Sequence, residues 1–233
     1  IIVPLSTKFS FLEVLVKATP LIFTGIAVTF AFSAGYYNIG AEGQLYAGAV
    51  AAAWVGATLT DLPAIVAIPL MLVLGFLAGM LWALIPALLK VKLKVDEVVT
   101  TLLMNSIIMY FISALLNGPW RNKETGWPQS PEFFEAARFI KLIPKSRLHL
   151  GFIIAIALVV IAYIVIKKTP FGLKMRAIGA SKAGAQFSGI NVNRTMLSAA
   201  LISGGIAGLA GVSEIAGIHY HLISELSNGL GYT

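Results

Sequence analysis

The stretch Leu62–Leu89, LPAIVAIPLMLVLGFLAGMLWALIPALL, runs without one charged residue. A helix of about 20 predominantly apolar residues crosses the hydrocarbon core of a bilayer, so this stretch is long enough to span a membrane. Its apolar residues lack the period-two alternation of barrel strands, and only helices or closed barrels satisfy their backbone in lipid. The stretch therefore predicts a membrane-spanning helix, and Pro69 and Pro86 inside it predict kinks.

Five further segments have the same character and run over Val14–Ala34, Leu45–Leu59, Val98–Leu116, Leu150–Ile166 and Met196–Val212. Leu45–Leu59 is short and rich in alanine, so we expect a helix buried inside a bundle rather than one facing lipid. The chain is 58% hydrophobic and 12% charged, against about 45–50% and about 25% in soluble domains. We predict an all-α integral membrane protein, one helical bundle of about six spans over residues 1–233. Because it begins at Ile1 and stops in a glycine-rich stretch, we expect truncation at both ends.

The distribution of basic residues indicates on which side of the membrane each linker lies. Three lysines, at 90, 92 and 94, follow the third segment, and the linker 167–195 contains basic residues and no acidic one. Cytoplasmic loops carry an excess of Lys and Arg, and counting the helices puts both linkers on the same side. We therefore expect both to be cytoplasmic and the linker 118–149 to be external, although that linker is also basic and is only partly balanced by Glu124, Glu132 and Glu135.

Within the outer linker, Ser130-Pro131-Glu132 is typical of a helix start, with an N-cap, a proline at the first position and an acid in the first turn. The apolar residues that follow share one helical face: Phe133, Phe134, Ala137 and Ile140. This pattern predicts a short helix lying on the membrane surface. The alternative is a helix packed on the outer rim of the bundle.

Small residues are dense in the last segment, where Gly204 and Gly208 form a GxxxG pair, as Gly75 and Gly79 do in the third. This spacing lets helix backbones approach closely, so we expect these glycines to serve helix packing. A glycine-lined substrate path is the alternative.

Polar residues interrupt the apolar pattern at GYYNIGAEGQ, residues 35–44, and again in the fourth segment. Polar groups at membrane depth are costly and persist where they line a polar cavity or bind something. The resulting substrate-path candidates are Asn38, Glu42, Gln44 and Asn105. Alternatively, Asn38 caps the next helix, Glu42 faces its positive end, and Asn105 bonds between helices.

Other chemistry is excluded by composition. The chain has no cysteine, and its three histidines show no metal-ligand spacing, so we predict neither a catalytic nor a metal site. No GxxxxGK[ST] motif occurs, so no ATP chemistry is expected in this chain. The net charge of +7 follows from membrane topology rather than from a nucleic-acid partner.

The basic stretch TPFGLKMRAIGASKAGAQFSGI, residues 169–190, predicts a short alanine-lined helix with glycine breaks that docks on a soluble partner, or simply an anchoring loop. This stretch resembles the cytoplasmic coupling segment of ABC-importer permeases of the branched-chain amino acid, ribose and nucleoside family. Asn38–Gln44 resembles the early motif of that family, and Asp96–Thr101 with Asn105 resembles its next motif. With the region Glu214–His221, the chain looks most like the nucleoside branch.

The resemblance implies a non-enzymatic permease of the bacterial-type cell membrane that imports nucleosides or related small polar solutes. It implies four kinds of partner: cytoplasmic ATPases that hold ATP and Mg²⁺, a second permease subunit of the same or another kind, an external substrate-binding lipoprotein of the basic-membrane-protein type, and membrane lipid. The coupling residues it implies are Gly172, Arg176, Ala177, Gly179 and Gly189.

Two alternatives remain. One is a sugar or branched-chain amino acid permease of the same family. The other, from a different class, is an ion-coupled secondary transporter. Intramembrane acids and paired broken helices are typical of such proteins. Glu42 is the only acid that the sequence places near a membrane core, and no inverted repeat is apparent.

Overall fold

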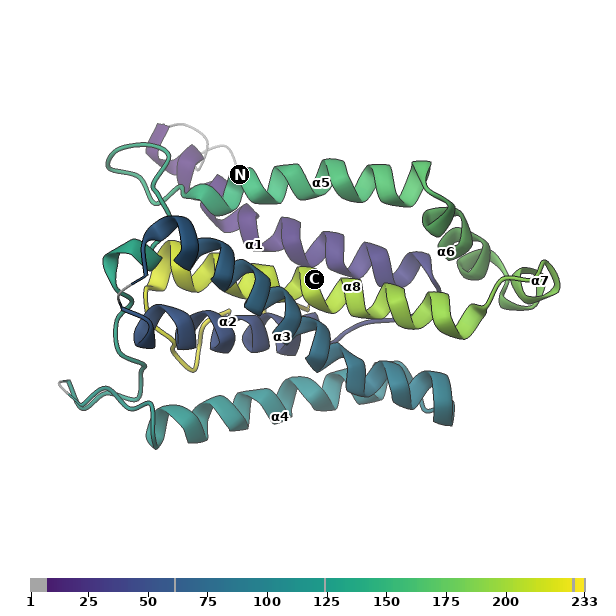
Figure 1. The fold of residues 1–233 in the computed structure, drawn as a ribbon, viewed down its shortest axis with the longest axis horizontal. Helices are drawn as coiled ribbons and strands as arrows, with labels where there is room; N and C mark the ends of the chain where they lie inside the picture. Colours follow the sequence, from purple (N-terminus) through teal and green to yellow (C-terminus); the bar gives the residue numbers. More distant parts are fainter. Residues whose placement is uncertain (1–7, 61, 124, 228, 233) are drawn as a thin grey trace.

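The computed structural model describes residues 8–60, 62–123, 125–227 and 229–232 (Figure 1). Within them the chain is helical, in the order α1 (Lys8–Ser33), α2 (Ala41–Thr58), α3 (Ala64–Leu93), α4 (Glu97–Asn117), α5 (Leu150–Lys168), α6 (Pro170–Ala180), α7 (Lys182–Phe187) and α8 (Val192–Glu214). A 3-10 turn, Glu135–Ala137, lies in the outer linker, and a π-helical turn, Ile215–His219, extends α8. The predicted polytopic helical bundle is confirmed. Glu124 and both ends of the predicted 1–233 bundle lie outside the described residues.

Five of the described helices, α1, α3, α4, α5 and α8, are long and apolar enough to cross a membrane. The sixth predicted span forms α2, which is shorter and starts inside the bundle, after a non-helical stretch (Figure 1). Its residues from Ala41 to Ala49 are all buried, so its predicted internal position is confirmed. Alanine and glycine suit this place because they leave no bulky side chain between neighbouring helices.

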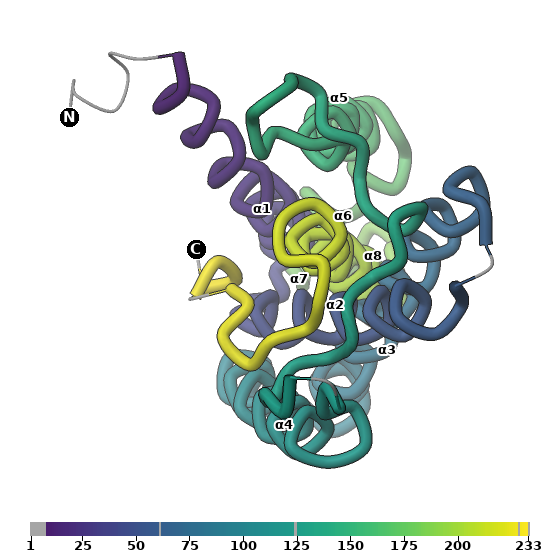
Figure 2. The backbone as a smooth tube through the Cα atoms, turned by 90° about the vertical axis from the view of Figure 1, so that its left-hand side faces the viewer, coloured from purple at the N-terminus to yellow at the C-terminus, as the bar shows by residue number. Residues whose placement is uncertain are grey.

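Helix α8 is the centre of the bundle. Looking along the helices, α1, α2 and α3 surround it, while α4 lies against α2 and α3, and α5 lies against α1 (Figure 2). Every residue of α8 from Ser203 to Glu214 is buried. The bundle therefore depends on a helix that contains little more than small side chains over its second half.

The glycine pairs of α3 and α8 face each other. A Cβ at Gly208 would overlap the carbonyl oxygen of Gly75, and a Cβ at Gly79 would overlap the carbonyl oxygen of Gly204. Gly48 of α2 meets Gly208 in the same way. Backbone contact at this crossing confirms the packing role of the GxxxG pairs and leaves no room for a path between them.

The two basic linkers lie at the same end of the bundle. The connection of α3 to α4 and the helices α6 and α7 are together at one end, and residues 118–149 are at the other (Figure 1). The shared side that helix counting predicts is therefore confirmed.

The helix predicted to begin at Ser130 is wrong, since only the 3-10 turn Glu135–Ala137 forms there. The Ser130 backbone donates to the Leu222 carbonyl at 3.0 Å, and its hydroxyl accepts from the Leu222 amide at 2.8 Å. The amide of Phe133 donates to the carbonyl of Tyr220 at 2.8 Å. The non-helical residues after α8 thus take the hydrogen bonds that a helix would need, and the linker stays extended across the end of the bundle.

Accessibility of single cysteines tests the orientation, because the chain has no cysteine of its own. Lys182 and Lys123 are both exposed and belong to opposite ends of the bundle. We expect an impermeant thiol reagent, applied to intact cells, to label Lys123→Cys and not Lys182→Cys, because the acid-free basic linker faces the cytoplasm. Both variants should react after the membrane is permeabilised. The opposite labelling would invert the orientation.

Candidate functional site

Residues 34–40 form a non-helical passage from the end of α1 to the start of α2. The chain turns at Gly35, whose φ of +66° is a backbone conformation that residues with a side chain rarely adopt. It then runs into the bundle, and α2 begins there at Ala41 (Figure 1). Non-helical backbone at membrane depth is tolerated only where protein groups satisfy its N–H and C=O groups.

One stripe of α4 supplies such groups. Glu97 and Thr101 are one helical turn apart on the same face, about 6 Å along the axis. Two residues of extended chain rise by about 6.6 Å, so the two spacings match. The amide of Tyr37 donates to Glu97 Oε1 at 3.5 Å, and the amide of Ile39 donates to Thr101 Oγ1 at 3.3 Å. Glu97 also pairs with Lys90 of α3.

Asn105 continues this stripe by one more turn and joins the passage to α2. Its Oδ1 accepts from the amide of Gly43 at 2.8 Å, and its Nδ2 donates to the carbonyl of Ile39 at 3.1 Å. The side chain is buried, and a Cβ on Gly43 would press on it. Asn105 therefore bonds between helices, as one of the two sequence interpretations predicted.

Asn38 and Gln44 form a reciprocal amide pair across the start of α2. Asn38 Nδ2 donates to Gln44 Oε1 at 2.9 Å and to Ser203 Oγ of α8 at 2.9 Å, while Gln44 Nε2 donates to Asn38 Oδ1 at 3.1 Å. Asn38 Oδ1 also accepts from the amide of Gly40. The predicted N-cap role of Asn38 is wrong, because its side chain closes a turn just before the helix and accepts from no backbone amide of α2.

Glu42 holds the C-terminal segment. After the π-helical turn the chain folds back into the bundle beside α2, as the yellow trace shows in Figures 1 and 2. Oε1 of Glu42 accepts from the hydroxyl of Ser227 and from the amide of Gly229, and Oε2 accepts from the amide of Gly231 at 2.6 Å. The carboxylate belongs to the first turn of α2, as predicted, but its partners come from this returning segment.

Tyr46, one turn further along α2, makes a second attachment. Its hydroxyl donates to the Ser224 carbonyl at 3.0 Å and accepts from the Leu226 amide at 3.1 Å. Gly231 lies so close to α2 that a Cβ on it would overlap the backbone of Glu42. Glu42 and Tyr46 on α2 thus provide hydrogen-bond partners for backbone groups of the non-helical segment that follows the π-helical turn.

The four predicted path residues therefore gather around one junction, as the sequence indicated. Each is at most 2% exposed, and each polar side chain is hydrogen-bonded within the chain. Contact of any of them with a transported solute stays a prediction. The sequence interpretation missed Thr101 and Ser203 as partners, although the spacing of four residues between Glu97, Thr101 and Asn105 carried the signal.

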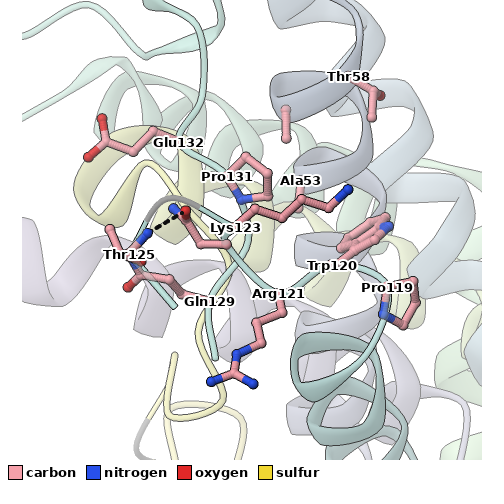
Figure 3. Close-up of a pocket in the computed structure, with 12 residues that line it drawn as sticks. Ala53, Thr58, Pro119, Trp120, Arg121, Lys123, Thr125, Gln129, Pro131 and Glu132 are labelled. Carbon is pink, nitrogen blue, oxygen red and sulfur yellow. Dashed lines mark hydrogen bonds between the residues drawn. The ribbon is translucent and has the colours of Figure 1, made fainter. Parts of the chain in front are cut away.

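A cavity of about 760 Å³ opens at the end of the bundle that holds the outer linker. Its wall combines the end of α2, at Ala53 and Thr58, with the linker between residues 119 and 132 (Figure 3). Trp120, Arg121 and Lys123 contribute an aromatic ring and two cations. Small-molecule sites occupy about 300–1,000 Å³, so the cavity is of the right size for a nucleoside or sugar.

The predicted coupling glycines divide into two kinds. A Cβ on Gly172 would overlap the carbonyl oxygen of Ile166, and a Cβ on Gly179 would lie 2.7 Å from that of Ser33. The lack of a Cβ at both glycines lets α6 pack closely on the ends of α5 and α1. Gly172 is buried and Gly179 is exposed, and their role in coupling stays a prediction. Gly189 is exposed, with no atom within reach of an added Cβ, and its φ of +78° turns the chain from α7 to α8.

The exposed surface of α6 and α7 has three prominent side chains. Arg176 is exposed, as a coupling residue requires, while Ala177 is half-buried. Leu173 is 60% and Phe187 96% exposed. The sequence interpretation did not single out Leu173 or Phe187, since only the tertiary packing shows which apolar residues of this linker lack a partner.

Residues 10–233 match the family model described as the branched-chain amino acid transport system permease component. A glucose ABC transporter permease protein of Haloferax volcanii is 37% identical over 98% of this chain and 63% of its own length. A guanosine ABC transporter permease protein of Bacillus subtilis is 36% identical over 94% of this chain and 64% of its own.

A nucleoside ABC transporter permease protein of Lactococcus lactis is 29% identical over 91% of this chain and 61% of its own length. The chain therefore spans a little under two thirds of the length of these relatives. No solved structure matches.

Glu42→Gln tests the attachment of the C-terminal segment. The amide keeps the shape but removes the charge and turns an NH₂ group toward backbone donors, so we expect a loss of about 1.5–3 kcal/mol in the free energy of unfolding. Thermal unfolding in micelles measures it, and hydrogen exchange at Gly229 and Gly231 should become faster. Glu225→Gln, an exposed carboxylate of the same segment, is the matched control. Unchanged exchange and stability with a marked loss of uptake would assign Glu42 to solute contact instead.

Proposed function

The chain belongs to the family of branched-chain amino acid transport system permease components, and on that premise we propose that it is the membrane-spanning subunit of an ATP-binding-cassette importer. The observation that carries the proposal is the family match over residues 10–233, which includes every described helix of the bundle but the start of α1. ATP hydrolysis belongs to separate cytoplasmic ATPase chains, and this subunit is not an enzyme. Its place is the bacterial-type cell membrane.

The proposed solute class is nucleosides or related small polar molecules. Two of the relatives are named for guanosine and for nucleosides, and one is named for glucose. The outer cavity supports this class, because Trp120 offers a ring for stacking and Gln129 offers an amide that both donates and accepts. A sugar would use the same amide and the cations, so sugars are the second candidate.

Ion-coupled transport is disfavoured by the partners of the buried acids. Three acids of the described chain are buried: Glu42 at the start of α2, Glu97 at the start of α4 and Glu214 at the end of α8. Glu42 is held by the segment 227–231 and Glu97 by Lys90, while Glu214 lies 3.8 Å from His219. Glu42 and Glu97 thus each bond to groups of the described chain, whereas a coupling site needs an acid that exchanges its ion. The contact of Glu214 is an ion pair only when His219 is protonated.

Contacts within the chain suggest how the ATPases act on the bundle. A partner docked on Phe187 and Arg176 would push on α6, which packs through Gly179 on Ser33 at the end of α1. The adjacent turn at Gly35 also lies against α6, with an added Cβ 3.7 Å from the Gly179 Cα. Beyond it, the passage 36–40 leads to α4 and α2. We propose that movement of α6 reaches the middle of the bundle along this route.

The remaining partners follow from the family. We propose a second permease subunit, identical or different, and an external substrate-binding lipoprotein that delivers solute to the end formed by residues 118–149. Because the binding protein captures the solute with high affinity, the permease itself needs only a weak binding site. The closed hydrogen bonding of Asn38, Gln44 and Asn105 is compatible with such a weak site.

Uptake by cells lacking the gene tests the function. We expect the reintroduced gene to restore uptake of labelled guanosine, and only together with genes for the ATPase and the binding lipoprotein. Labelled glucose and leucine serve as the matched solutes. Uptake of glucose or leucine without guanosine would reassign the solute. Uptake that needs no ATPase and stops when the ion gradient is dissipated would contradict the importer class.

Phe187→Ala tests the docking surface. Because this side chain is 96% exposed, its removal should leave thermal stability unchanged within about 0.5 kcal/mol. A truncated interface anchor costs at least about 2 kcal/mol, so binding of the purified ATPase should weaken about 30-fold. Trp127→Ala is the matched control, an exposed aromatic at the opposite end. Equal ATPase binding by wild type and Phe187→Ala would remove Phe187 from the interface.

A further inference from the structure

A second cavity, of about 450 Å³, lies at the end of the bundle that carries the basic linker. Phe171 and Lys174 of α6 form one wall, and Arg194 and Thr195 in the first turns of α8 form another. The connection of α7 to α8, at residues 188–191, closes it between them. The cavity is thus built by the two helices that leave and re-enter the bundle at this end, not by the exposed surface around Phe187.

The charge of this cavity is positive. Its lining includes Lys174 and Arg194 and no acidic residue, and the whole linker 167–195 contains none. Neither cation forms an ion pair among the described residues. The acids at the α3–α4 connection are engaged elsewhere, since Asp96 accepts from the first amides of α4 and Glu97 pairs with Lys90.

The helix that leads into the cavity wall, α5, is largely exposed. Helix α5 is one of the least buried spans, and Tyr163 and Ile164 near its end are about half exposed. It ends at Lys168, and α6 begins at Pro170, so Phe171 at the cavity wall lies three residues after the end of this exposed span. The apolar outer face of α5 suits the acyl chain of a phospholipid, and the two cations, Lys174 and Arg194, suit its phosphate.

We propose that this cavity binds the phosphate of an anionic glycerophospholipid, with Arg194 and Lys174 as the phosphate ligands and the outer face of α5 carrying an acyl chain. Guanidinium groups match phosphate through paired N–H donors, and an ammonium adds a point charge. Basic pockets between membrane helices recognise such headgroups. The bound lipid would join α6 to α8 and so stiffen the segment on which a cytoplasmic partner acts.

The test compares lipid retention by the purified full-length permease in micelles that contain phosphatidylglycerol or phosphatidylcholine, read by native mass spectrometry. The wild type should retain phosphatidylglycerol preferentially. Lys174→Gln with Arg194→Gln should lower its affinity by about fivefold for each charge removed. Lys167→Gln with Lys168→Gln removes the same charge from exposed residues outside the cavity and should leave it unchanged. The exchange Lys174→Arg with Arg194→Lys keeps the charge and should retain the lipid.

Three results would overturn the proposal. An equal loss in both neutralised variants would show diffuse attraction to the whole basic linker. Displacement of phosphatidylglycerol by inorganic phosphate at equal concentration would assign the cavity to a free anion. Unchanged lipid retention combined with lost ATPase binding in Lys174→Gln with Arg194→Gln would make the cavity a contact for acidic side chains of the partner.

Discussion

Every other feature of this bundle depends on satisfying the non-helical backbone that enters it between α1 and α2. The hydrocarbon of a bilayer offers no hydrogen bonds, so backbone N–H and C=O groups that enter a membrane bundle need protein partners. The stripe Glu97, Thr101 and Asn105 on α4 supplies several of them, because one helical turn advances by nearly the same distance as two extended residues. This match fixes α4 against the start of α2.

The same need for hydrogen-bond partners applies to the returning C-terminal segment, whereas the central glycines serve close packing between helices. Residues 224–227 and 229–231 lie beside α2, where Glu42 and Tyr46 accept hydrogen bonds from their backbone amides. The backbones of α2, α3 and α8 touch near Gly208. Such close packing leaves polar groups as the main source of specificity between helices, because lipid provides little hydrophobic drive for their association.

The bundle thus has a buried, hydrogen-bonded centre and two ends with open surfaces. The centre holds the buried polar residues in closed hydrogen-bond pairs, whereas the open surfaces lie at the outer cavity near Trp120 and at the helices α6 and α7. Gly179 and Gly35 connect the second of these ends to the centre by close contact. In the proposed importer, solute arrives at one end and force at the other, and the passage 36–40 lies between them.

The sequence by itself determined the helical membrane fold, the common side of the basic linkers and the packing role of the GxxxG pairs. Hydropathy and small-residue spacing act locally, so they can be read without coordinates. It also identified Asn38, Glu42, Gln44 and Asn105 as a group. Only the tertiary structure decided their partners and the extended course after Ser130. Those outcomes depend on which buried backbone groups of distant segments need a hydrogen-bond partner. Such groups meet only when the folded chain brings these segments together.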